Sequence, residues 1–181
     1  MSKTRVRTVI ICEDTQQECF ARRFLYGMGW KNQHLRIVKS PSAKGSAEQW
    51  VKDRYVNELG YYHKTQITYA IIAIVDGDTI GVEGRIKQFE KTCIERGTQI
   101  RSDSAAVAII VPTRNIETWI HYLQGKQVDE TTVYPILKYE SECQPAVQKL
   151  LDLCKTTGLP TNAPNSLNAA CAEYRTRILS G

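Results

Sequence analysis

Three runs of consecutive apolar residues, each followed by a helix-like stretch, limit the folds open to this chain. The runs are TVIICED (8–14), YAIIAIVD (69–76) and AAVAIIVP (105–112). Strands have this character when helices cover both faces of a parallel sheet. HLRIVKS (34–40) alternates apolar and polar residues instead, which predicts a strand at the edge of the same sheet.

The segments between these runs have helical periodicity. Phe20, Phe24 and Met28 are spaced four residues apart, which places them on one helix face. The predicted helices cover residues 15–28, 46–59, 82–96 (with Gly97 as the C-cap) and 114–123. Repeated alternation of strand and helix with short connections predicts an α/β fold, with a central, mainly parallel four-stranded sheet in doubly wound, Rossmann-like order.

The alternation of predicted strands and helices ends after residue 125. We expect helices at about 142–156 and 166–179, and an extra strand around TVYPIL (132–137). The chain is therefore divided into an α/β core, residues 1–125, and a mostly helical C-terminal extension packed on it, residues 126–181.

The composition is that of a globular protein, with 42% hydrophobic and 24% charged residues. Residues 1–60 carry eleven Lys and Arg against six Asp and Glu, which accounts for the whole net charge of +5. A basic N-terminal half fits a phosphate-rich partner such as nucleic acid, although a solvated surface has the same charge. The chain has no apolar stretch long enough to span a membrane and no signal-peptide pattern at its start, so we expect a cytoplasmic protein.

Six cysteines are scattered without a CxxC pair, and most of them fall at apolar positions of the predicted elements. In a reducing compartment they are expected to be free thiols in the core. They are Cys12, Cys19, Cys93, Cys143, Cys154 and Cys171.

Carboxylates follow three of the predicted strands. Glu13 and Asp14 end the first, Asp76 and Asp78 end the third, and Glu117 begins the helix after the fourth. In open α/β sheets ligands bind at the carboxyl ends of the strands, and a 2-1-3-4 strand order would bring these side chains to one rim. Oxygen ligands suit a hard cation such as Mg²⁺. Taken alone, Asp-Gly-Asp is more often a turn.

Two further groups are candidates for substrate contact. On a helix, Arg114, Glu117 and His121 would form one stripe, with Arg114 available to a phosphate and His121 a weaker candidate base or ligand. Lys44 precedes a predicted helix N-terminus, which is a place where phosphates bind, although Ser46 is also a plain N-cap. Gly77, between the two aspartates, would allow a ligand to approach the backbone closely.

These residues resemble the Toprim domain, the catalytic module of topoisomerases, bacterial primases and OLD-family nucleases. The likeness rests on the glutamate of VIICEDTQQECF, the DxD of AIVDGDT and the segment TRNIETWI, which is similar to a segment of OLD-type and related phage-defence Toprim proteins. It covers roughly residues 8–123. Where the family usually has Gly after the glutamate, this chain has Asp14.

The resemblance implies a Toprim-like fold and a nuclease that uses Mg²⁺ or Mn²⁺ to hydrolyse DNA or RNA, with a part in phage defence alongside a separate ATPase subunit. Glu13, Asp76, Asp78 and Glu117 would be its metal ligands and catalytic residues. Arg114 and Lys138 would contact the substrate. Lys44 is a further candidate contact, on the separate ground that it precedes a helix N-terminus.

Two other functions remain open. A non-catalytic Toprim-like module would bind nucleic acid or a partner protein without cleaving anything. A flavodoxin-like or receiver-like α/β domain would use the same acidic rim for a different phosphoryl reaction.

Overall fold

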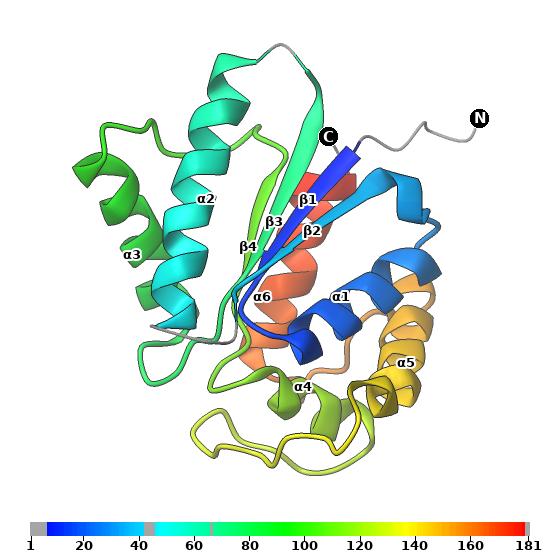
Figure 1. Cartoon of the computed structure of the whole chain (residues 1–181). Coiled ribbons are helices and arrows are strands. Elements are labelled where there is room, and N and C mark those ends of the chain that lie inside the picture. Colours follow the sequence, from blue (N-terminus) through cyan, green and yellow to red (C-terminus); the bar gives the residue numbers. More distant parts are fainter. Residues whose placement is uncertain (1–6, 42–45, 66, 180–181) are drawn as a thin grey trace.

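The protein, described here by a computed structural model for residues 7–41, 46–65 and 67–179, is built around a four-stranded parallel sheet (Figure 1). The spatial order of the strands is β2-β1-β3-β4, and every pair is parallel. The strands are β1 (Arg7–Cys12), β2 (Leu35–Lys39), β3 (Tyr69–Ile74) and β4 (Val107–Ile110). This confirms the predicted α/β class and the edge position of the second strand.

Helices follow the strands as the alternation predicts. They are α1 (Thr15–Gly27), α2 (Ala47–Lys64), α3 (Gly81–Glu95), α4 (Ile116–Leu123), α5 (Gln144–Lys155) and α6 (Asn165–Tyr174). Short 3-10 segments cover Asn32–His34 and Glu140–Cys143, and a π-helical turn, Arg175–Leu179, continues α6. None of the described helices has the length and apolar character required to cross a membrane.

The caps of these helices agree with the local sequence. The Ser46 hydroxyl accepts a hydrogen bond from the Gln49 amide at 3.2 Å and so caps α2. Gly97 follows α3 with a φ of +66°, the left-handed conformation that ends many helices. Lys44, the candidate phosphate contact in front of α2, lies outside the described residues.

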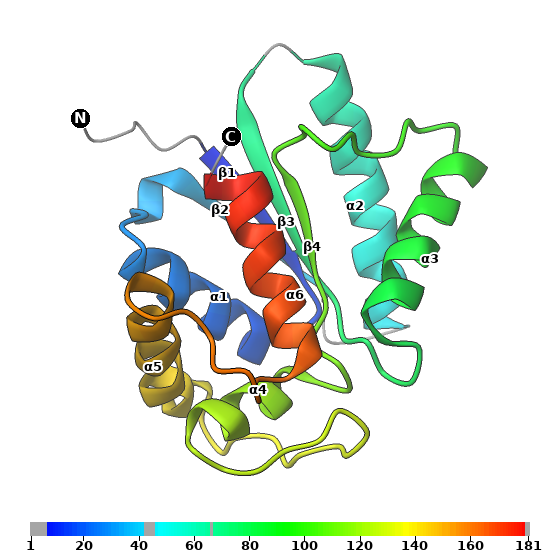
Figure 2. The same cartoon turned by 180° about the vertical axis from the view of Figure 1, so that it is seen from behind.

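The sheet is covered on both faces, as Figures 1 and 2 show. Helices α2 and α3 lie on one face. Helices α1 and α6 lie on the other, with α5 packed on the outer side of α1. Side chains of successive strand residues point to opposite faces, so both faces must be apolar, which explains the unbroken apolar runs.

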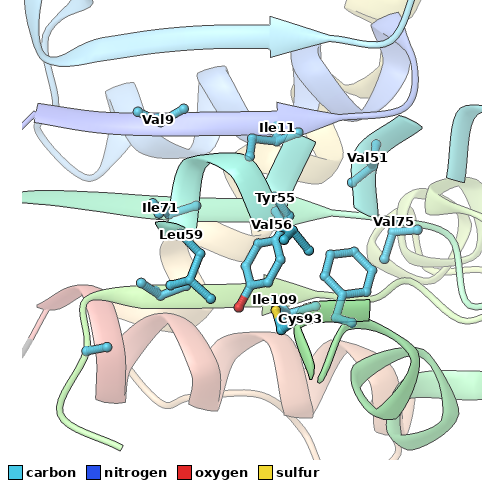
Figure 3. Packing of buried hydrophobic residues seen from close by; sticks show 14 of the residues in the cluster. Val9, Ile11, Val51, Tyr55, Val56, Leu59, Ile71, Val75, Cys93 and Ile109 are labelled. Carbon is cyan, nitrogen blue, oxygen red and sulfur yellow. The ribbon is translucent and has the colours of Figure 1, made fainter. Parts of the chain in front are cut away.

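On the α2–α3 face, side chains of the two helices pack on the strand residues that point to that face. In Figure 3, Tyr55 and Leu59 of α2 meet Ile71 of β3 and Ile109 of β4. The ring of Phe89 from α3 packs edge-on against Tyr55, with 4.9 Å between the ring centroids.

The opposite face depends on the C-terminal part of the chain. Tyr174 of α6 and Ile178 pack against strand residues that include Ile10 and Ile72. The Trp30 indole N–H donates to the Tyr174 hydroxyl at 3.1 Å. Residues 126–179 therefore complete the core as well as packing on its surface.

The strand expected at residues 132–137 is wrong, because the segment between α4 and the 3-10 turn at Glu140–Cys143 is irregular. The Asp129 carboxylate accepts hydrogen bonds from the amides of Thr131 and Thr132, which forms a turn. Pro135 has no N–H to donate to a neighbouring strand. These two features outweigh the β-branched residues that suggested a strand.

All six cysteines are free thiols, as expected. Five are buried, and Cys154 on α5 is exposed.

Candidate active site

Two carboxylates from adjacent strands meet at the carboxyl end of the sheet. Glu13 follows β1 directly, and Asp76 lies two residues beyond β3. The Glu13 carboxylate oxygen Oε1 accepts a hydrogen bond from the Asp76 amide at 2.5 Å. The strand order is 2-1-3-4, the condition under which the sequence predicts that these carboxylates share one rim, and it places the two loops side by side.

Gln17 links the same two residues from α1. Its side chain is fully buried. Its Oε1 accepts from the Glu13 amide at 2.9 Å, and its Nε2 donates to Asp76 Oδ1 at 2.9 Å. Gln17 was not among the residues predicted from the sequence. The available signal was the capping-box spacing of Asp14 and Gln17 at the start of a helix, since the Asp14 side chain accepts from the Gln17 amide at 2.8 Å and caps α1.

The environment of the pair opposes negative charge. Burial, followed by the charges of Glu13 and Asp14, raises the pKa of the Asp76 carboxyl to about 8. Burial also raises the pKa of Glu13 to about 7, against the lowering effects of the Asp76 amide and the Arg85 charge. At neutral pH the two groups titrate as a pair that retains a proton unless a cation balances them.

Asp78 is held apart from this pair. Its side chain is 63% exposed, and its Oδ2 lies 2.8 Å from Nη2 of Arg85. In an extended chain, Asp76 and Asp78 would point to the same side because they are two residues apart. The structure differs because β3 ends at Ile74 and Asp78 has a φ of +44°.

Arg114 also has a left-handed backbone, with a φ of +66°. It forms an isolated antiparallel bridge with Asp78, so two non-glycine residues in an unfavourable conformation face each other at the rim. Such strain tends to be concentrated at functional sites. Arg114 precedes α4, which begins at Ile116, so the predicted helical stripe of Arg114, Glu117 and His121 is wrong in its first member.

The remaining candidates have other surroundings. Glu117 is 4% exposed; burial raises its pKa, its own amide lowers it and the Asp14 charge raises it. His121 lies against the Tyr134 ring with 5.1 Å between centroids. Lys138 lies in the loop before α5, with its ammonium group 5.2 Å from the Tyr139 ring centroid. No described interaction joins His121 or Lys138 to the Glu13–Asp76 pair.

Gly77 lets the loop after β3 pack closely against the loop after β4. It is buried, and its amide donates to the Pro112 carbonyl at 2.7 Å. A Cβ built on Gly77 would lie 3.1 Å from Val111 Cγ1 and 3.2 Å from the Pro112 oxygen. The close approach predicted for this glycine is therefore made by the loop after β4.

We expect Gly77→Ala to destabilise the protein by about 1–3 kcal/mol, the usual effect of overpacking, because backbone atoms of residues 112 and 113 would have to move. Urea unfolding measures the change. Gly97→Ala is the control. A Cβ added at Gly97 would meet no atom within 4 Å, so any loss of stability in this variant comes from its φ of +66° and not from a steric clash. An unchanged midpoint for Gly77→Ala would contradict the tight loop contact.

The described residues contain no group of three or more His, Cys, Asp or Glu side chains placed to hold a metal ion together. The Glu13 carboxylate contacts Asp76 through the Asp76 backbone amide, and its charge raises the pKa of the Asp76 carboxyl, so these two residues are the candidate donors. One or two carboxylates completed by water are a common coordination for Mg²⁺.

Comparisons with protein-family models, with curated proteins and with solved structures gave no match for this chain.

Proposed function

We propose that this protein is a metal-dependent phosphodiesterase of Toprim type that hydrolyses DNA or RNA. The observation that carries the proposal is the contact between Glu13 and Asp76 at the carboxyl end of two adjacent parallel strands. Ligand sites of open α/β sheets lie at this position. The same two residues belong to the motifs on which the Toprim resemblance rests.

The residues of this rim fit Mg²⁺ or Mn²⁺. The donors are carboxylate oxygens, which hard cations prefer. Burial is the main cause of the raised pKa values of Glu13 and Asp76, and a bound cation would favour the ionised form of both groups. When bound, such an ion lowers the pKa of water and balances charge on a phosphate. The Toprim resemblance would add Asp78 and Glu117 to its ligands, but in this structure Asp78 Oδ2 is paired with Arg85 instead.

The chain's own side chains position this centre. Gln17 fixes one oxygen of Asp76 and the backbone of Glu13, so the pair has a defined geometry before any ligand binds. Arg114 is joined to Asp78 at the rim by a backbone bridge, and its guanidinium would contact a substrate phosphate. A buried nitrogen of its guanidinium, Nε, has no hydrogen-bond partner among the described residues.

The proposal includes a nucleic-acid substrate and, from the resemblance to OLD-type proteins, a part in phage defence alongside a separate ATPase subunit. The basic N-terminal half of the chain supports a polyanionic partner.

The test is cleavage of end-labelled DNA and RNA oligonucleotides by the full chain with Mg²⁺, with Mn²⁺ and with EDTA. We expect metal-dependent cleavage that falls more than about 100-fold in Glu13→Gln, which retains an acceptor for the Asp76 amide but loses the charge. Asp103→Asn, an exposed carboxylate in the loop before β4, is the matched control. Cleavage that persists in Glu13→Gln would contradict the proposed centre.

The second candidate is a non-catalytic Toprim-like module that binds nucleic acid or a partner protein. It is favoured by the ion pair that engages Asp78 with Arg85, and by the lack of a three-carboxylate group among the described residues. For this function, oligonucleotide binding would persist in Glu13→Gln, and cleavage would be absent with every metal tested.

A further inference from the structure

Arg85 is the buried cation of the candidate site. It is 2% exposed and is the one Lys or Arg among the buried polar residues that the structure describes. It lies one turn into α3, the helix that follows the Asp-Gly-Asp loop. A buried guanidinium requires charge partners and hydrogen-bond acceptors, and Arg85 finds them on three segments.

The contacts of Arg85 lock it against the loop after β3. Its Nε donates to the Asp76 carbonyl at 2.9 Å, and its Nη2 lies 2.8 Å from Asp78 Oδ2. Its Nη1 lies 2.6 Å from Glu48 Oε1 of α2 and 2.9 Å from Gln88 Oε1. One side chain thus neutralises two carboxylates and holds the backbone of a third residue.

The backbone of Asp78 is part of this arrangement. Its φ of +44° is unfavourable for a residue with a side chain, and in this conformation its carboxylate meets the guanidinium. The charge of Arg85 also reaches the other carboxylate of the centre, since it lowers the pKa of Glu13 against the effect of burial. The charge of Arg85 therefore acts both on the Asp78 carboxylate and on the Glu13 carboxyl.

A metal ion bound to the Asp78 oxygen that contacts Arg85 would share that oxygen with a fixed positive charge. Like charges at such separations repel, and the guanidinium cannot turn away into solvent because it is buried, although the Asp78 side chain is itself largely exposed. Moving Arg85 away would strip a buried guanidinium of its partners. Asp78 is therefore poorly available to a second cation while Arg85 is in place.

We propose that Arg85 occupies, as a built-in cation, the position beside Asp78 that a second metal ion would otherwise take, so that the site binds a single divalent cation at Glu13 and Asp76. This inference rests on the proposed function. It specifies the number of ions and assigns Asp78 to the guanidinium, which the Toprim resemblance does not do.

The test counts bound ions and does not depend on activity. The full chain is titrated with Mn²⁺ alone, and free Mn²⁺ is followed by electron paramagnetic resonance. We expect one ion per chain in the wild type. Asp78→Asn should keep one ion with a dissociation constant within about 3-fold, and Glu13→Gln should bind more than about 10-fold more weakly.

Arg85→Gln tests the displacement itself. Without the guanidinium, Asp78 loses its ion-pair partner, while Glu48 keeps the Lys52 ammonium group at 2.7 Å. We therefore expect a second Mn²⁺ to bind at Asp78. A folded Arg85→Gln that still binds one ion would contradict the inference. If Arg85→Gln does not fold, the ion counts and dissociation constants of the wild type and Asp78→Asn test the inference. Asp78→Asn is suitable because Asp78 is largely exposed and its replacement leaves the core intact.

The failures of the two proposals are distinguishable. Two ions in the wild type, or binding weakened more than about 10-fold in Asp78→Asn, would overturn the single-ion inference and leave the proposed function standing. No bound ion in the wild type would overturn the metal-dependent function and the inference together.

Discussion

Asp76→Asn is expected to raise the unfolding temperature of the metal-free protein at pH 8 and to lower metal-dependent cleavage more than about 100-fold. Burial and the charges of Glu13 and Asp14 raise the pKa of Asp76 to about 8. An asparagine keeps the acceptor for Gln17 and removes the charge. Stability and activity should therefore change in opposite directions, as is common where a site opposes folding.

The sign follows from the protons bound in each state. In the unfolded chain the Asp76 carboxyl titrates at the ordinary aspartate pKa of 3.8, and in the folded protein its pKa is about 8. Between these values the folded state holds the extra proton, so unfolding becomes easier as pH rises. The contribution of the Asp76 carboxyl to the free energy of unfolding is therefore most favourable below about pH 4 and is lost as the pH rises toward 8.

The size of the effect is limited by screening and relaxation at the partly exposed rim. We expect about 1–3 kcal/mol between wild type and Asp76→Asn at pH 8, or about 3–8 °C in melting temperature for a chain of this size. The difference should shrink at pH 4. Adding Mn²⁺ at pH 8 should stabilise the wild type and leave Asp76→Asn unchanged.

Melting curves followed by circular dichroism at pH 4 and pH 8 measure both effects, with Asp103→Asn as the control carboxylate in the loop before β4. A lower melting temperature for Asp76→Asn at pH 8 would show that the carboxylate is stabilised in its site.

Removal of residues 126–181 is expected to prevent folding of the remaining chain. The deleted part supplies the large buried side chains of one sheet face and of the packing on α1 and α4, namely Val147, Leu150, Leu151, Leu167, Tyr174 and Ile178. At about 1.5–3 kcal/mol for each, their loss exceeds the net stability of a typical domain.

The same deletion removes polar contacts that join the two parts. The Trp119 indole N–H of α4 donates to the Ser166 hydroxyl at 2.8 Å, and Trp30 loses its bond to Tyr174. We expect residues 1–125 to be insoluble, or to bind a hydrophobic dye and unfold without cooperativity.

Tyr174→Phe in the full chain is the mild counterpart. It keeps the ring and removes one hydrogen bond, so we expect a loss of about 1 kcal/mol with cooperative unfolding retained. A cooperative, dye-free transition for residues 1–125 would contradict the view that the C-terminal helices complete the core.

Local patterns predicted the framework because they report which side of a segment is apolar. The runs around Ile10, Ile72 and Ile109 are buried on both faces of the sheet, and the alternating segment at Leu35–Lys39 is its edge strand. Glu13 and Asp76 could be predicted for the same reason, since their position at strand ends follows from where the apolar runs stop.

Partners across elements could not be read in this way. Gln17 and Arg85 lie on helices and look like ordinary polar residues in the sequence. Their roles depend on contacts that join Gln17 to Asp76 and Arg85 to Glu48, and such pairs are made when helices pack on the sheet. The neighbours of Arg114 have helical periodicity and so predict a helix there, whereas its bridge to Asp78 requires a left-handed backbone.

By itself, then, the sequence determined a parallel α/β sheet with carboxylates at the ends of its strands, because apolar periodicity and the points where strands stop are properties of short segments. The tertiary structure alone decided that Asp76 shares a partly buried site with Glu13 and that Asp78 is paired with Arg85. The physical reason is that the two aspartates are two residues apart in the chain but meet groups from different elements. Burial and charge differ at each, and both are set only when those elements come together.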